Sequence, residues 1–349
     1  MLTLAESRGI ALARGVIVFL IAPIHGVMVY STPEVKHGLL GKLMAFFAEY
    51  PGAHLFMFLM GAFVVLSKKK CYRFIAKRFI ILLFAGWILN IFKFVIPHLF
   101  KLLPANFYTG NQFVQDKYIA LRLLFINDIL QFAAFAYLIC ALIRRSSSPL
   151  LIASAAGLAT LIFSPLVWDK GSTGSFFSNV FVDLLGGFPP KTYFPLFPWL
   201  YHCLSGMVFG LLVQRNNFSH SIFLSVGILL TMAGHFISGY EPEFWNVTFF
   251  RTGWGGTLFH NGVTILWISL FFVIRKHVQD HWLIHFFEWC SKQITSIYLV
   301  QWCIIMWLML WVGYENSGIR ESVLLIISTS IMSLFIASSI TKKQNSTNE

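Results

Sequence analysis

Arg14 and His25 lie in the first long apolar stretch of the chain, "ARGVIVFLIAPIH", residues 13–25. At about 100° per residue, the eleven-residue separation is about three helical turns, so a helix places both side chains on one face. At about 1.5 Å per residue, they lie about 16 Å apart along that face. Because ionisable groups in membrane helices are costly and usually face a bundle interior or a wet cavity, the pair is a candidate functional site.

The two side chains suit two parts of one reaction. An imidazole, with a pKa of about 6.5, can take a proton from a hydroxyl or an amine at neutral pH. A planar guanidinium binds phosphate groups through paired hydrogen bonds. The plainer interpretations are that Arg14 extends to the phosphates of the inner lipid leaflet and that His25 is a hydrogen-bonded packing residue.

The composition indicates an integral membrane protein. Of the 349 residues, 57% are hydrophobic and only 11% are charged, whereas a soluble domain is about 25% charged. The net charge of +12 could suggest a nucleic-acid partner, but in a multi-span protein basic residues mark the cytoplasmic loops, so we expect no nucleic acid. The cysteines form no C-x-x-C pair, and we interpret them as small apolar packing residues. They are Cys71, Cys140, Cys203, Cys290 and Cys303.

Apolar runs bounded by charge, glycine or proline predict an all-α integral membrane fold, a bundle of about ten transmembrane helices. No small-residue cleavage site follows the first run, so we expect it to remain as a span. We expect a single transmembrane domain over 1–341 and a cytoplasmic tail over 342–349. The predicted spans are 10–30, 51–67, 79–100, 124–143, 149–167, 194–213, 219–237, 255–275, 291–313 and 321–341.

The loops between these spans indicate the orientation of the chain. Loops after even-numbered spans are short and mostly basic; "KKKCYRFIAKR", after the second span, holds six basic residues in eleven. Loops after odd-numbered spans are longer, mixed in sign and rich in glycine, proline and aromatic residues. The positive-inside rule then places both termini in the cytoplasm and the long loops outside.

The arginine–ten residues–histidine spacing resembles the first-span signature of the membrane acyltransferase-3 superfamily, in particular the branch of heparan-α-glucosaminide N-acetyltransferase and its bacterial relatives. The sequence departs from that family's pattern at Ala11, where an aspartate is usual, at Met60, where a serine is frequent, and at Gln301, where a histidine is usual. Four further stretches are similar to its later spans, in the same order: "HLFMFLMGAFVVLSKK" (54–69), "NDILQFAAFAYLICALI" (127–143), "YFPLFPWLYHCLSGMVFG" (193–210) and "ITSIYLVQ" (294–301).

The resemblance implies a transmembrane acyltransferase that moves an acyl group, most often acetyl, from cytoplasmic acyl-CoA to a sugar of a surface or periplasmic glycan. His25 would be the catalytic base or an acyl relay. Asp128, at the outer start of the fourth span, could orient His25, or it could simply cap its own helix. His37, in the first outer loop, could contact the acceptor, although a solvated loop residue is the plainer interpretation.

The donor side of this hypothesis rests on basic residues at the cytoplasmic mouth. Arg14, Arg73, Lys77 and Arg78 would bind the phosphates of acetyl-CoA, or the last three could serve only as topogenic charge. We expect no metal, because the histidines lack paired spacing and H-E-x-x-H is absent.

Two other functions are compatible with the composition. A secondary transporter with a midplane site is the main alternative, but transporters tend to bury acids near mid-span and to show similar halves. The third interpretation is an inactive homologue in an assembly.

We expect a multi-pass protein of the cell membrane, or of the inner membrane if the source is bacterial. Its expected partners are acyl-CoA, a carbohydrate or glycolipid acceptor and the lipid bilayer, and a homodimer is possible. His202 and His235 are interpreted as packing residues.

Overall fold

The computed structural model describes residues 2–68, 71–113, 118–168, 174–246 and 248–346, with side chains up to residue 341. The regular structure of these residues is helical; β-pairing within them is limited to isolated bridges. The all-α fold class is therefore confirmed, and the protein is an integral membrane helical bundle.

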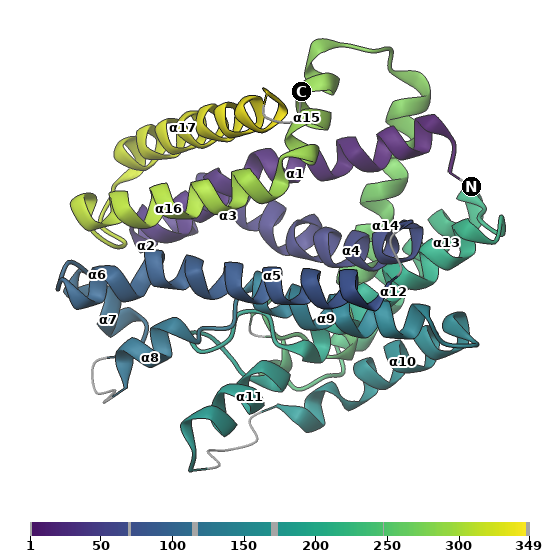
Figure 1. Ribbon diagram of the computed structural model, residues 1–349, viewed down its shortest axis with the longest axis horizontal. Coiled ribbons are helices and arrows are strands. Elements are labelled where there is room, and N and C mark those ends of the chain that lie inside the picture. The colour runs from purple at the N-terminus through teal and green to yellow at the C-terminus, as the bar shows by residue number, and fades with distance from the viewer. Residues whose placement is uncertain (1, 69–70, 114–117, 169–173, 247, 347–349) are drawn as a thin grey trace. The chain divides into compact units, whose positions relative to one another are not determined.

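Every predicted span corresponds to a helix or a pair of consecutive helices (Figure 1). Among the described residues, nine helical stretches are long and apolar enough to cross a membrane. They are α1 (Leu4–Tyr30), α3 with α4 (Leu39–Leu66), α5 with α6 (Tyr72–Leu99), α10 (Pro149–Val167), α12 (Leu196–Gln214), α13 (His220–Ser238), α14 (Trp254–His277), α16 (Ile294–Val312) and α17 (Ile319–Ser346).

The fourth predicted span is shorter than expected. Its helix, α9 (Ile129–Arg144), begins at the Asp128 cap, so the first residues of the predicted range 124–143 lie outside it. Asn127 instead pairs with the segment before α12: its amide donates to the Lys191 carbonyl, and its own carbonyl accepts from the Tyr193 amide. This backbone pairing, which apolar composition does not reveal, removes the start of the span.

Several segments predicted as loops are short helices. These are α2 (Pro33–His37), α3 (Leu39–Phe47), α7 (Ala105–Gly110), α8 (Ile119–Leu124), α11 (Phe176–Gly186) and α15 (Trp282–Lys292). The second span starts at α3 because a π-helix, η1 (Ala48–Gly52), carries the chain past Pro51, where a break is expected. Likewise, α17 runs to Ser346, beyond the predicted start of the tail.

The chain folds into two compact units assembled from separate stretches. The first combines Ala53–Ile88 with Phe125–Leu270, and the second combines Thr3–Gly52, Leu89–Leu124 and the chain from Phe271 onward. The single domain expected over 1–341 stays a prediction.

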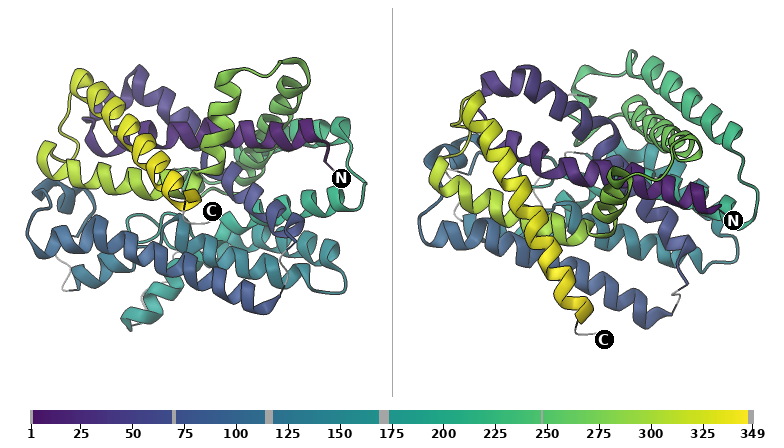
Figure 2. Two further views of the ribbon diagram at one scale, coloured as in Figure 1. Left: turned by 45° about the horizontal axis from the view of Figure 1, so that its top comes forward. Right: turned by 90° about the horizontal axis from the view of Figure 1, so that it is seen from above.

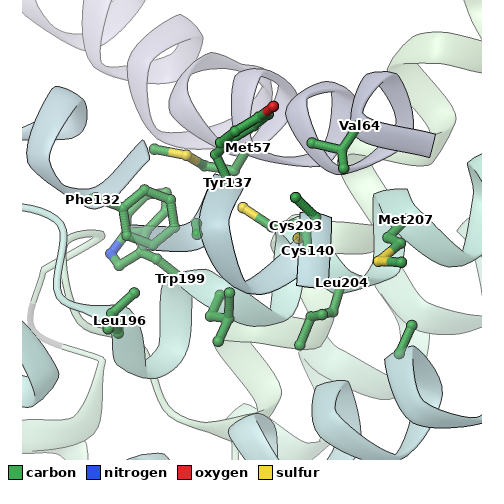
Figure 3. Packing of buried hydrophobic residues seen from close by; sticks show 14 of the residues in the cluster. Met57, Val64, Phe132, Tyr137, Cys140, Leu196, Trp199, Cys203, Leu204 and Met207 are labelled. Atoms are coloured by element: carbon green, nitrogen blue, oxygen red, sulfur yellow. The ribbon is translucent and has the colours of Figure 1, made fainter. Parts of the chain in front are cut away.

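The first unit is built around the close packing of α4 (Ala53–Leu66) and α12. A side chain on Gly61 would collide with the Cys203 carbonyl, and one on Gly206 would collide with the Phe58 carbonyl. Small residues allow membrane helices this close approach. Figure 3 shows the apolar core beside this contact, where α4, α9 and α12 contribute Met57, Val64, Phe132, Tyr137, Cys140, Leu196, Trp199, Cys203, Leu204 and Met207.

The predicted packing role of the cysteines is confirmed for those in the cores and wrong for one. Cys140, Cys203 and Cys290 are buried and Cys303 is half-buried, but Cys71 is exposed beside α5. All five are free thiols. Cys71 lies in a short basic connection between helices, where apolar neighbours are few.

In the second unit, α1 packs against α15, α16 and α17, and the yellow α17 crosses α16 at an angle in both views of Figure 2. Helix α1 begins with a capping box between Thr3 and Glu6. Gly15 lets α15 approach closely, because a side chain there would collide with the Phe287 carbonyl. Further along, the buried Tyr30 hydroxyl donates to the Ile305 carbonyl of α16 at 3.1 Å. These contacts fix the face of α1 that carries Arg14 and His25.

Candidate functional site

His25 is hydrogen-bonded to the side-chain amide of Gln301 on α16. Its Nδ1 lies 3.2 Å from Oε1 and 3.0 Å from Nε2 of Gln301. Gln301 is fully buried, and its Nε2 also donates to the Tyr298 carbonyl at 3.2 Å. The amide can therefore accept a hydrogen bond from Nδ1 or donate one to it, so it is compatible with either tautomer of His25 without movement of the ring.

Two aromatic side chains pack against the imidazole of His25. The His25 ring stacks on the indole of Trp302, with centroids 4.1 Å apart and planes at 26°. The Tyr298 ring meets it edge-on at 6.4 Å. With one ring nitrogen bonded to Gln301 and one face covered by Trp302, the remaining nitrogen, Nε2, has a defined direction.

A buried lysine that our sequence interpretation overlooked contacts the same indole. Lys93 is 2% exposed, and its Nζ lies 4.1 Å from the Trp302 ring and 4.8 Å from the Phe94 ring. It is the only Lys, Arg, Asp or Glu of the apolar run over 79–100. An isolated charge inside a predicted span was the signal that could have found it.

Arg14 bonds to the helix that precedes α16. Its Nε donates to the Ser291 hydroxyl at 2.8 Å, and Ser291 on α15 is fully buried. Since α15 and α16 are consecutive, the bonds of Arg14 and His25 place both side chains on the same side of α1. This agrees with the shared face that their spacing predicts.

A cluster of ion pairs fastens α15 to the start of α1. Arg8 donates from Nε to Glu288 at 2.7 Å and from Nη1 to Asp280 at 2.9 Å. Arg275 also donates to Asp280, at 2.8 Å. The hydrogen bond from Arg8 is the main cause that lowers the pKa of the Asp280 carboxyl. By holding α15, this cluster also positions Ser291 beside Arg14.

Asp128 caps α9, as one of the two interpretations of the sequence expects. Its carboxylate accepts from the Ile129 amide at 2.8 Å, and the Asp128 amide N–H donates to Oε1 of Gln131 at 3.2 Å. Asp128 belongs to the first unit and His25 to the second. Its role in orienting His25 stays a prediction, and Gln301 already bonds the Nδ1 position that an orienting carboxylate would use when Nε2 is the base.

His37 is exposed at the last residue of α2. This position fits the plainer interpretation of a surface residue, and contact with an acceptor stays a prediction.

Arg73, Lys77 and Arg78 are exposed in the first turns of α5, in the first unit. The Arg78 guanidinium lies 5.4 Å from the Tyr137 ring. Two further arginines lie near them: Arg144 donates to the Ser67 carbonyl at 2.5 Å, and Arg145 covers the Tyr72 ring at 3.9 Å. The structure thus adds two arginines to the basic surface that the sequence predicts, while its role in CoA binding stays a prediction.

A second group of histidines lies in the core of the first unit. The ring of His54 stacks on His260 at 4.3 Å, with planes at 3°, and meets His202 edge-on at 4.6 Å. All three are buried, so the packing interpretation of His202 is confirmed, whereas His235 is exposed on α13 and that interpretation is wrong. Within the part of the chain described, no His, Cys, Asp and Glu side chains group in a way that could hold a metal ion.

Comparison with known proteins gives a match at the level of a family. The family model described as an acyltransferase domain, that of acyltransferase-3, matches residues 7–342. No curated protein matches the chain, and no solved structure matches it. The matched range includes Arg14, His25, Lys93 and Gln301.

Proposed function

Since the chain belongs to the acyltransferase-3 family and is a multi-pass membrane acyltransferase, we propose that it moves an acyl group, acetyl in the first instance, from cytoplasmic acyl-CoA to a sugar of a surface or periplasmic glycan. The observation that carries this proposal is the arrangement at His25, where Gln301 and Trp302 fix the direction of the imidazole. The family match does not favour the alternative of a secondary transporter.

The proposed base is Nε2 of His25. For Nε2 to be unprotonated, Nδ1 must carry the proton and donate to Oε1 of Gln301, 3.2 Å away. Nε2 then accepts the proton of the acceptor hydroxyl or amine as that group attacks the thioester carbonyl carbon. Gln301, which stands where the family usually has a histidine, holds the ring but does not titrate, so the proton stays on His25.

The collapse of the tetrahedral intermediate completes the transfer. The carbonyl forms again, the carbon–sulfur bond breaks, and the CoA sulfur takes the proton that His25 accepted. In the relay version of the mechanism, Nε2 itself attacks the thioester and the carbon–sulfur bond breaks, which releases CoA as a thiolate. The acceptor then displaces the acyl group from the imidazole, and its proton passes through Nε2 to the thiolate. Both versions need the same unprotonated Nε2 and the same orientation of the ring.

The donor's phosphates are assigned to basic side chains. Arg14 is oriented by its bond to Ser291, and a planar guanidinium held in this way suits phosphate. Arg73, Lys77 and Arg78, exposed at the start of α5, would attract CoA from the cytoplasm. This assignment follows the positive-inside orientation, with both termini cytoplasmic and the protein in the inner membrane of a bacterial source.

Mass spectrometry of cell-surface glycans tests the proposal. We expect acylated glycans from cells with the wild-type protein, and their loss from cells that lack it or carry His25→Ala. The control is His235→Ala, an exposed histidine on α13, which should leave acylation unchanged. Normal acylation with membrane-inserted His25→Ala protein would overturn the assignment of the base.

A further inference from the structure

The buried lysine of the second unit has no role in the steps above. Lys93 lies near the outer end of the predicted third span and is 2% exposed. A lysine side chain near a helix end usually extends toward water, and burial of an ammonium group is costly without compensating partners. Here Nζ lies 4.1 Å from the Trp302 ring and 4.8 Å from the Phe94 ring, and aromatic faces attract a desolvated cation.

The backbone around Lys93 is unusual as well. The lysine is the central residue of a π-helix, η2 (Ile91–Val95), and such turns often occur at functional sites. The Phe92 carbonyl accepts a hydrogen bond from the indole N–H of Trp307 on α16 at 3.1 Å. At the preceding residue, the Asn90 amide donates to the Leu124 carbonyl at 3.0 Å. The turn that presents Lys93 is therefore fastened on both sides.

Lys93 and His25 contact the same indole. Each lies 4.1 Å from the Trp302 ring centre, so the ammonium nitrogen and the imidazole centre are separated by no more than about twice that distance. In addition, Nε1 of Trp302 is buried and has no hydrogen-bond partner within the described part of the chain. A base, a cation and an unpaired buried donor thus lie around one aromatic ring.

We propose that Lys93 is a further catalytic residue, whose ammonium donates to the thioester oxygen as that oxygen becomes an oxyanion, with the Trp302 N–H as a second donor. This inference rests on the proposed acyl transfer. When the acceptor oxygen or nitrogen bonds to the carbonyl carbon, His25 takes the proton and the π electrons of the carbonyl move to its oxygen. That oxygen carries the negative charge until the carbon–sulfur bond breaks.

The distances suit this division of roles. A base lies about 3 Å from the atom that it deprotonates, and an oxyanion donor lies about 3 Å from the oxygen that it stabilises. The tetrahedral carbon must therefore lie within reach of both groups, and their shared contact with Trp302 keeps the imidazole centre and the ammonium within about twice 4.1 Å of each other. The buried position of Lys93 strengthens the interaction, because charges attract more strongly where water is excluded.

Turnover and binding of purified protein distinguish this role from a structural one. With acetyl-CoA as donor and the envelope fraction as acceptor, Lys93→Met should lower kcat by about 100- to 1000-fold, the usual loss of an oxyanion donor. The dissociation constant for CoA should stay at the wild-type value. Trp302→Phe keeps the stacking but removes the N–H and should give a smaller loss of kcat. Lys93→Arg keeps the charge and should recover part of the activity that Lys93→Met loses.

The outcomes separate this inference from the proposed function. Wild-type kcat in folded Lys93→Met, together with inactive His25→Ala, would overturn the role of Lys93 alone. Wild-type activity in both variants would overturn the acyl-transfer site itself. If Lys93→Met does not fold, Lys93→Gln and Lys93→Arg decide the question: equal kcat values for these two variants would show that the charge has no part in catalysis.

Discussion

Both units of this protein hold histidine inside apolar helices, buried in the first unit and half-buried in the second, and different groups surround the rings. In the first unit, the His54 ring stacks on His260 and on the Trp199 indole and meets His202 edge-on. In the second, the single ring of His25 bonds to an amide and stacks on an indole that an ammonium group contacts. Acyl transfer needs groups with different roles, a base, an orienting partner and a donor to the oxyanion. A set of like groups offers no such division, so we propose that the chemistry takes place in the second unit.

The largest effect is expected for His25→Ala. Loss of a general base costs about 100- to 10,000-fold in rate. We expect kcat of the purified protein to fall by this amount, with insertion and yield unchanged. His202→Ala in the first unit serves as the comparison and should retain the wild-type rate if it folds. A larger loss in His202→Ala than in His25→Ala would reverse the assignment of the two units.

The next effect concerns the donor and Arg14. Removal of a charge-assisted hydrogen bond to phosphate costs about 1.5–3 kcal/mol, or roughly 10- to 150-fold in affinity. Arg14→Ala should therefore raise the dissociation constant of a CoA analogue by this factor, with kcat at saturation little changed. Arg14→Lys keeps the charge without the planar fork and should give an intermediate value.

Arg73→Ala tests the same hypothesis on the first unit. Arg73 is exposed, so its effect on CoA affinity should be smaller than that of Arg14 and should decrease as salt rises. Equal dissociation constants for wild type, Arg14→Ala and Arg73→Ala would leave these residues with a topogenic role only.

A moderate effect is expected for Gln301→Leu. The change removes the hydrogen bond that holds Nδ1 of His25, and a neutral hydrogen bond contributes about 0.5–1.5 kcal/mol, or roughly 2- to 10-fold in kcat. Gln301→His, which restores the residue usual in the family, should keep the ring bonded and recover activity. If Gln301→Leu and Gln301→His have the same kcat, the partner at Nδ1 does not orient the base.

The local features of the site were predictable, and its long-range contacts were not. The spacing of Arg14 and His25 depends only on the helical period, and the Asp128 cap depends on a pattern within four residues. Gln301 was visible in the sequence as a departure from a family pattern. Its bond to His25 joins residues 276 positions apart, and neither residue type nor spacing reveals such a pairing.

Lys93 and the two π-helices show a second limit of prediction from the sequence. The spans were predicted from their apolar length, and this criterion does not single out a lone lysine within one of them. The π-helices at η1 and η2 carry the chain through Pro51 and aim Lys93 inward, and their cause lies in packing against neighbouring helices, as in the bond from Trp307 to the Phe92 carbonyl. Helix propensity within a short window of sequence cannot predict where such π-helices form.

The smallest effect is expected for His260→Phe, which tests whether the histidines of the first unit take part in the reaction. The His260 ring is stacked almost parallel on His54 at 4.3 Å, and a phenyl ring keeps that stacking with a similar volume. Changes of this kind in a core usually cost less than about 1.5 kcal/mol. We therefore expect kcat and CoA affinity close to wild type, with at most a modest fall in thermal stability. A large fall in kcat at unchanged stability would mean that the histidines of the first unit take part in the reaction, and the assignment of chemistry to the second unit alone would be wrong.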